Sequence, residues 1–173
     1  MAEQSITKCA LMKSFTQLME TEQFSKIGIA EICNGCDMNR KSFYYHFKDK
    51  QDLIIWMFEY DVSHALTCRS QESFGTYIEK LCACLYEKRN LYKKLLKIDG
   101  QNNLFDYIRN RLYTEYGTFF NTETEYARFL SSFKSDAIAL AIKRWICEND
   151  TQRCEAFVPQ LLRAAEIQNK DRL

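Results

Sequence analysis

The residues best suited to chemistry lie between Met38 and Lys50, where basic residues and tyrosines are interleaved with two phenylalanines. On a helix with about 100° between residues, Phe43 and Phe47 fall on one side and the polar residues centre on the other. Four bases and one acid give this stretch a net charge of +3. Such a face suits phosphate oxygens and base edges. A solvated surface helix would give the same wheel, so the pattern alone leaves both interpretations open.

The elements that would position this face are two short helices joined by a tight turn. Residues 28–34 and 40–47 have a helical pattern, and Asn34-Gly35-Cys36-Asp37 between them is rich in residues that tolerate a left-handed backbone. Asn39 has the residue type and position of an N-cap for the second helix. This arrangement predicts a helix-turn-helix, whose second helix enters the major groove of DNA.

Composition limits the other possibilities. The chain has 173 residues and a formal net charge of +1, so binding of a polyanion must depend on a local patch. The N-terminus lacks the pattern of a signal peptide, and no apolar run approaches the ~18 residues of a membrane span. We therefore expect a soluble cytoplasmic protein with no membrane partner, in which most of the eight cysteines are free thiols.

The chain as a whole predicts an all-α protein of about nine helices, because it has one proline, five glycines and apolar residues at three- and four-residue spacing. A helix-turn-helix DNA-binding domain over residues 1–49 is expected to precede an effector-binding and dimerisation domain over residues 50–173. The expected helices cover about residues 5–20, 28–34, 40–47, 49–68, 74–88, 90–98, 104–119, 122–149 and 151–167.

The eighth expected helix carries the strongest signal for self-association. Its first half has one apolar stripe, whereas its second half is apolar on two sides and must be buried on two sides. Thr122 is expected to cap this helix, and Pro159 to bend or interrupt the ninth. We expect the last two helices to pair with their copies in a four-helix bundle through Phe133, Ala137, Leu140, Ala141, Trp145, Phe157 and Leu161.

Cys33-x-x-Cys36 invites a zinc or a redox interpretation. A structural zinc site needs four ligands, and no histidine lies near this pair in the sequence. A thioredoxin-like motif needs a βαβ context that is absent, so structural thiols are favoured, with a redox switch as the alternative. His46 and His64 have no nucleophile patterned beside them. We therefore expect no enzyme, no cofactor and no metal site.

The sequence Ser42-Phe-Tyr-Tyr-His-Phe47, followed by Lys50-x-x-Leu53, resembles the DNA-binding domain of the TetR family of transcriptional regulators. The resemblance covers about residues 8–56 and includes Ala30-Glu-Ile-Cys33 in the preceding helix. By position it implies base contacts by Arg40, Lys41, Ser42 and Ala30, and phosphate contacts by Tyr44, Tyr45, His46 and Lys50.

Three positions depart from the family pattern. Asp37 stands at the turn position usually held by glycine and must accept a left-handed backbone at some cost. Lys41 replaces a small residue, so the base preference is expected to be this protein's own. Ala30 is too short to hydrogen-bond a base, and the first helix of the pair is expected to contribute little to sequence readout.

The body of the chain carries a shorter resemblance. Residues 100–108, Gly-Gln-Asn-Asn-Leu-Phe-Asp-Tyr-Ile, resemble a TetR-family subgroup that includes the activator of dihydroxyacetone-kinase operons, whose effector is a partner protein. The family resemblance favours an effector cavity between helices, and plain core packing is the alternative for the aromatic residues there. The candidates for the effector pocket are Cys82, Leu85, Tyr86, Phe105, Ile108 and Leu112.

Together these patterns predict a sequence-specific transcriptional regulator that binds a palindromic double-stranded DNA operator as a homodimer. Its control is expected to come from a small-molecule effector or a co-regulator protein bound to the body. The alternative is a protein–protein interaction regulator with weak or no DNA binding, which the near-neutral net charge and Asp37 leave open.

Overall fold

The computed structural model describes residues 2–65, 73–101, 103–120, 123–148 and 152–166. Within these ranges the chain forms nine α-helices and no strand, which confirms the all-α prediction. None of the described helices is long and apolar enough to cross a membrane. The chain divides into two compact units, residues 1–59 and residues 60–173.

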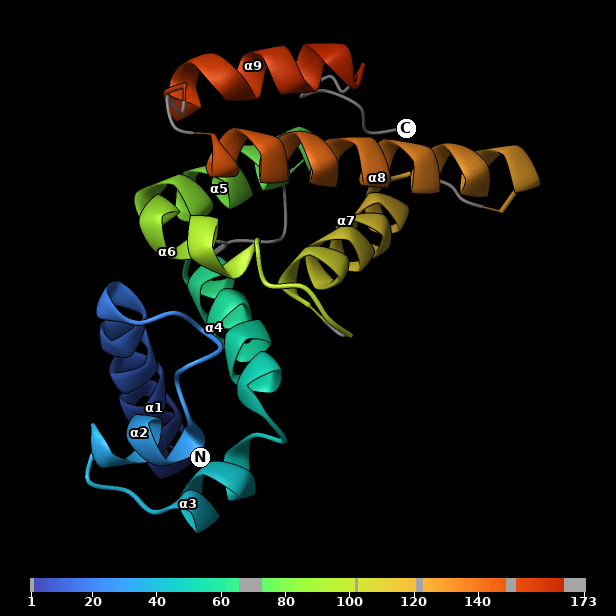
Figure 1. The fold of residues 1–173 in the computed structure, drawn as a ribbon. Helices are drawn as coiled ribbons and strands as arrows, with labels where there is room; N and C mark the ends of the chain where they lie inside the picture. Colours follow the sequence, from blue (N-terminus) through green and yellow to red (C-terminus); the bar gives the residue numbers. More distant parts are fainter. Residues whose placement is uncertain (1, 66–72, 102, 121–122, 149–151, 167–173) are drawn as a thin grey trace. The chain divides into compact units, whose positions relative to one another are not determined.

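Unit 1 contains α1 (Ala2–Thr21), α2 (Ile29–Asn34), α3 (Arg40–His46) and most of α4 (Lys50–Ala65) (Figure 1). Each of the four helices contributes apolar side chains to one core. Almost fully buried are Leu11, Phe15, Ile32, Phe43, Phe47, Leu53, Ile54 and Met57. The inward placement of Phe43 and Phe47 agrees with the helical wheel and fixes which face of α3 stays open.

The end of α2 lies very close to α1. A Cβ atom added at Gly35 would collide with the Ser14 hydroxyl oxygen, so any larger residue here requires the Ser14 side chain to move. The Ser14 hydroxyl donates a 2.7 Å hydrogen bond to the backbone carbonyl of Ile32. These two contacts hold the first helix of the helix-turn-helix against α1.

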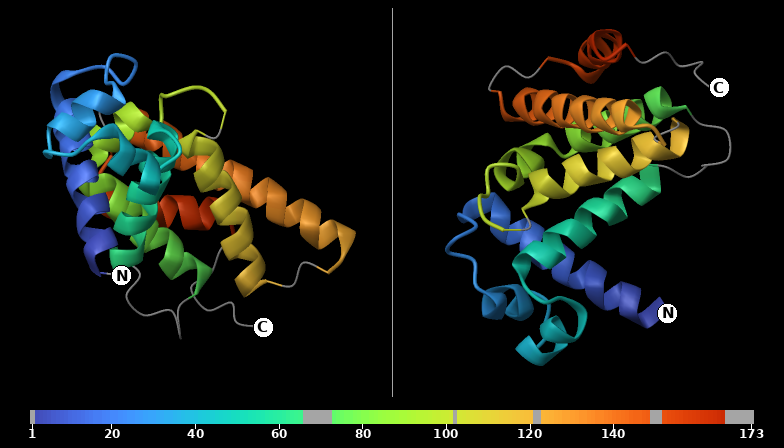
Figure 2. Two further views of the ribbon diagram at one scale, coloured as in Figure 1. Left: turned by 90° about the horizontal axis from the view of Figure 1, so that it is seen from below. Right: turned by 90° about the vertical axis from the view of Figure 1, so that its right-hand side faces the viewer.

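Unit 2 contains the end of α4, α5 (Phe74–Glu87), α6 (Arg89–Leu95), α7 (Leu104–Phe119), α8 (Glu125–Cys147) and α9 (Cys154–Ala164). Helix α7 packs along α8, and α5 contacts α7, α8 and α9 (Figures 1 and 2). Three aromatic rings join α5, α8 and α9, because Trp145 lies 5.5 Å from Tyr86 and 4.2 Å from Phe157 with nearly parallel planes. The Trp145 indole N–H donates to the carbonyl of Gln152 at 2.7 Å.

Two details of unit 2 differ from the expectations. Helix α8 begins at Glu125 and is capped by Thr124, whose hydroxyl accepts the Ala127 N–H at 3.1 Å. The expected cap, Thr122, lies outside the described residues. Helix α9 continues through Pro159, so the expected interruption is wrong. Pro159 is exposed, and the buried side chains of Val158, Leu161 and Leu162 hold the helix on both sides of it.

Candidate nucleic-acid interface

The turn before α3 and the cap at its start follow the sequence closely. Asp37 adopts the left-handed conformation, with φ of 53°, as its position in the turn requires. Asn39 is the N-cap, and its side-chain oxygen accepts the Ser42 N–H at 2.9 Å. The Ser42 hydroxyl donates to the same oxygen at 3.3 Å. The start of α3 is therefore capped by hydrogen bonds within the turn itself.

The outer face of α3 is open and rich in hydrogen-bond donors. Tyr44 is 58% exposed and Tyr45 is 72% exposed, and Arg40 and Lys41 are exposed as well. We call these four residues the α3 face. A guanidinium, an ammonium and two phenol hydroxyls within two helical turns can meet phosphate oxygens and the acceptor atoms of guanine.

His46 lies partly inside unit 1, at the end of α3. Its ring meets the Tyr45 ring edge-on, with centroids 4.9 Å apart. Burial, with a smaller contribution from the positive charge of Lys8, lowers the pKa of His46 below its ordinary value of 6.5. His46 is therefore neutral at pH 7 and offers a phosphate an N–H group rather than a full charge.

Two lysines near α3 differ in how far they reach into solvent. Lys50 is half-buried, and its ammonium donates to the backbone carbonyls of Phe24 and Ile27. Lys48, which the sequence reasoning did not single out as a site residue, is exposed directly after α3. Its contribution to the +3 charge of residues 38–50 is the sequence signal that makes it a further candidate for the site.

The Cys33 and Cys36 thiols lie at the turn. Cys33 is buried, and the Cys36 thiol donates to the carbonyls of Ile32 and Cys33 at 3.4 and 3.5 Å. Burial raises the pKa of both thiols, so neither is a reactive thiolate at neutral pH. Among the described residues the seven cysteines are free, and no three metal-ligating side chains are gathered closely enough to hold a metal ion.

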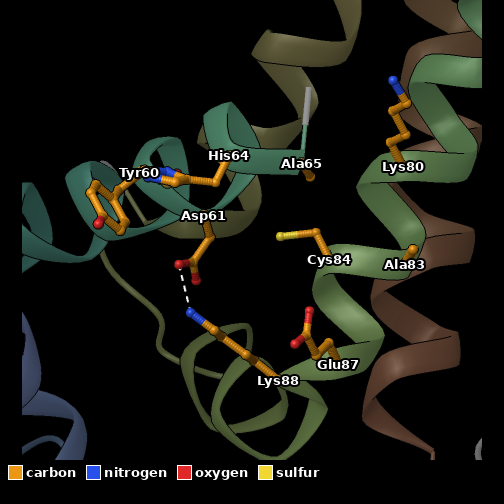
Figure 3. Close-up of a pocket in the computed structure, with 9 residues that line it drawn as sticks. All are labelled: Tyr60, Asp61, His64, Ala65, Lys80, Ala83, Cys84, Glu87 and Lys88. Atoms are coloured by element: carbon orange, nitrogen blue, oxygen red, sulfur yellow. Dashed lines mark hydrogen bonds and ion pairs between the residues drawn. The ribbon is translucent and has the colours of Figure 1, made fainter. Parts of the chain in front are cut away.

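An open cleft of about 520 Å³, with charged residues among those that line it, lies in unit 2 between the end of α4 and α5 (Figure 3). Asp61 is buried at its edge, where its carboxylate accepts hydrogen bonds from Lys88 Nζ at 2.6 Å and from the Tyr92 hydroxyl at 2.8 Å. The Cys84 thiol and the Glu87 carboxylate project from α5 into the same space. Burial, with a smaller contribution from the charge of Asp61, raises the pKa of Cys84 to about 11.

The six effector-pocket candidates lie elsewhere in unit 2. None of them lines this cleft. Tyr86 and Phe105 are half-buried, and Phe105 lies under the ammonium of Lys143 at 4.5 Å. The other four are fully or almost fully buried in the apolar core, namely Cys82, Leu85, Ile108 and Leu112.

The seven dimer candidates fall into two groups. Phe133, Ala137 and Leu140 are exposed and Ala141 is half-buried. Trp145 and Leu161 are buried within unit 2, and Phe157 is half-buried against Trp145.

Tyr126 and Phe129 extend the exposed group along α8, at 71% and 65% exposure. We call Tyr126, Phe129, Phe133, Ala137 and Leu140 the α8 stripe. The N-terminal end of helix α8 reaches beyond the other helices of unit 2 (Figures 1 and 2).

A helix-turn-helix with an open, cationic second helix, carried on an all-α chain, defines a DNA-binding regulator. Comparison with known proteins gives the family. Residues 14–56 match the model for bacterial regulatory proteins of the tetR family, and residues 72–166, more than half of the chain, match the model for a transcriptional regulator C-terminal region. The chain belongs to the TetR family of DNA-binding transcriptional regulators, whose members regulate transcription and are not enzymes.

Among individual proteins, the chain is 28% identical over 101 residues to the HTH-type dhaKLM operon transcriptional activator DhaS of Lactococcus lactis subsp. lactis (strain IL1403). The match covers 57% of this chain and 54% of that protein, about half the length of the curated relative. This agrees with the subgroup resemblance of residues 100–108.

Solved structures with the same fold include the dihydroxyacetone kinase operon activator DhaS, with a TM-score of 0.69 and 19% identity over 95% of this chain and 97% of that one. A TetR transcriptional regulator from Streptococcus agalactiae 2603V has a TM-score of 0.67, also with 19% identity, over 95% of this chain and 96% of that one. At this level of identity the two structures establish the fold.

Proposed function

We propose that this regulator binds a palindromic double-stranded DNA operator as a homodimer in the cytoplasm, with one α3 helix of each copy in a major groove. The observation that carries the proposal is the α3 face, which combines exposed donors with a capped helix start. Two such helices related by a two-fold axis suit half-sites about one helical turn apart, roughly 34–36 Å, or a modest multiple of that spacing.

Within this proposal the residues of α3 divide by chemistry. Arg40 and Lys41 carry base readout, because a guanidinium or ammonium can reach the guanine acceptors in the major groove. Ser42 lies beside them, although its hydroxyl is already bonded to Asn39. Tyr44 and Tyr45 donate to phosphates, as their exposure allows.

The resemblance also assigns phosphate contacts to the two residues that lie further inside unit 1. His46 can offer a neutral N–H to a phosphate oxygen. Lys50 differs from it, because two of its donors are already held by backbone carbonyls.

The homodimer is supported by the α8 stripe. Its members follow one another at three- and four-residue steps, which places them on a single line along the helix. Contiguous exposed apolar surface of this kind marks protein interaction sites. A second copy is the occupant we propose, because a two-fold axis brings the same stripe of the partner against this one. Trp145, Phe157 and Leu161 would then support the bundle from inside each protomer.

Control is proposed to act on residues 50–173, with residues 1–49 as the DNA-binding domain. A small polar effector bound in the cleft, or a co-regulator protein on the body, would change the spacing of the two α3 helices. Helix α4 suits this coupling because it runs from Lys50, next to α3, to Ala65 at the cleft. The candidates Cys82, Leu85, Tyr86, Phe105, Ile108 and Leu112 form the adjoining core, through which such a change would pass.

The test is selection of duplex DNA from a random-sequence library by the wild-type protein. We expect a two-fold symmetric sequence, bound with affinity that falls steeply as salt is raised. Tyr44→Ala should weaken binding to this selected duplex roughly ten-fold, whereas Lys13→Ala, on an exposed position of α1, should leave it unchanged. If no duplex is enriched at low salt, or Tyr44→Ala binds as wild type does, the protein–protein regulator becomes the better account.

A further inference from the structure

The ammonium of Lys50 is turned into unit 1. Its Nζ donates to the carbonyl of Phe24 at 2.9 Å and to that of Ile27 at 2.6 Å. It also lies 4.2 Å from the centroid of the Phe24 ring. An ammonium has three N–H donors, so two of the three are committed inside the protein.

The two carbonyls belong to the loop between α1 and α2, where no helix ladder provides them with donors. Backbone carbonyls away from water need a hydrogen-bond partner, and the side chain of Ile27 is buried at this point. Bonds from a charged donor are shorter and about twice as strong as neutral ones. Lys50, the first residue of α4, therefore anchors this loop to the start of that helix.

Glu31 fixes the other end of the same loop. Its carboxylate accepts the Gly28 N–H at 2.6 Å, which caps the start of α2. The chain enters the helix-turn-helix through this loop and leaves it through residues 47–49, directly before Lys50. One side chain thus joins the segment that precedes α2 to the segment that follows α3.

We propose that Lys50 is a positioning residue for DNA binding and not a phosphate contact. Its two carbonyl bonds hold the α1–α2 loop against the start of α4, and this sets the direction in which α3 projects. The direct phosphate charge then comes from exposed bases such as Lys48, two residues before Lys50 in the chain. This inference rests on the proposed binding of operator DNA, and it replaces the role that the family resemblance implies for Lys50.

Lys50→Met and Lys48→Met form a matched pair for the test. Affinity for the duplex selected by the wild-type protein is measured over a range of salt concentrations. Each phosphate contact contributes ~0.9 to the slope of log affinity against log salt, or ~1.8 for two copies. In Lys48→Met the slope of log affinity against log salt should be shallower by this amount, and the melting temperature should stay at the wild-type value.

Lys50→Met should behave in the opposite way. We expect roughly ten-fold weaker binding at every salt concentration, an unchanged slope and a lower melting temperature. Lys50→Met with a reduced slope and the wild-type melting temperature would overturn the proposal.

A measurement on the wild-type protein decides the question if Lys50→Met does not fold. Side-chain ¹⁵N NMR should detect a Lys50 ammonium that exchanges slowly with water and keeps its shift when the selected duplex is added. A Lys50 signal that moves on DNA binding as strongly as that of Lys48 contradicts the anchor. Absence of any selected duplex would refute the proposed DNA binding instead, and fast exchange of the Lys50 ammonium in the free protein would still refute the anchor.

Discussion

The open faces of α3 and α8 both expose aromatic rings, yet their surroundings are chemically opposite. On α3 the rings are tyrosines next to Arg40 and Lys41, so every large side chain ends in a donor. On the α8 stripe, Phe129, Phe133 and Leu140 carry no polar atom on their side chains. Exposed aromatic surface alone therefore does not identify a partner. The groups beside the rings indicate the partner. Hydrogen-bond donors suit a nucleic acid, and hydrocarbon side chains suit a second protein surface.

The largest effect is expected from a charge placed in the α8 stripe. Phe133→Asp loses the burial of one phenylalanine per copy in the proposed dimer, about 2–3 kcal/mol each, so this dimer should dissociate at least about a thousand-fold more readily. Sedimentation velocity over a range of protein concentrations measures this. Ser132→Asp, on an exposed neighbouring position of the same helix, is the control. If Phe133→Asp remained dimeric at the concentrations at which the wild type is dimeric, the α8 stripe would not be the dimer surface.

A substitution on the α3 face should lower the affinity for DNA and leave self-association unchanged. Arg40→Ala removes the proposed base contact, worth about 1–3 kcal/mol in each half-site, and we expect at least a ten-fold loss of affinity with relaxed preference at one base pair. Sedimentation should stay as in the wild type, because the proposed dimer surface lies on α8. Fluorescence anisotropy with the selected duplex and its single-base variants measures the change. Equal affinity and unchanged base preference would show that the cationic face is only solvated surface.

A smaller effect is expected at the cleft of unit 2, whose lining includes no residue of the α3 face or of the α8 stripe. Asp61→Asn removes the charge that accepts hydrogen bonds from Lys88 and the Tyr92 hydroxyl. Because Asp61 is buried, we expect a loss of about 1–3 kcal/mol in the free energy of unfolding. Urea unfolding measures it, with Glu87→Gln on the same cleft as control. An unchanged midpoint in Asp61→Asn would mean that this ion pair adds no net stability to unit 2.

The smallest effect concerns pH and His46. Its pKa in the folded state is lowered, mainly by burial, so the unfolded chain binds more protons as pH falls through the ordinary value of 6.5. The free energy of unfolding should therefore decrease between pH 7.5 and pH 5.5, by about 1 kcal/mol or less. His46→Gln should show a smaller decrease over this interval than the wild type. Identical pH dependence in the two proteins would contradict the assignment.

Local sequence patterns predicted unit 1 well. The N-cap at Asn39, the left-handed Asp37 and the burial of Phe43 and Phe47 each depend on residues within one or two helical turns. These interactions follow from residue type and spacing, and propensity and tertiary packing agree there. The expected limits of most helices are likewise within a few residues of those in the structure.

Contacts between residues far apart in the chain were not predictable in the same way. The bonds of Lys50 to Phe24 and Ile27 span more than twenty residues, and that of Asp61 to Lys88 spans 27. Trp145 was expected in the dimer interface, whereas in the structure it stacks on Phe157 and is buried within unit 2. A helical wheel gives the apolar side of a helix, but it does not say which neighbour covers that side.

Methylation interference on the selected duplex tests the central contrast most directly, because it locates guanine contacts in the major groove of each half-site. The account predicts two symmetric sets of contacts about one helical turn apart, or a modest multiple of that spacing. Arg40→Ala should lose one guanine from both sets, and Phe133→Asp should lose the symmetry at protein concentrations that saturate one half-site. A single asymmetric set in the wild type, or a pattern that neither substitution changes, would contradict the assignment of DNA to α3 and of self-association to α8.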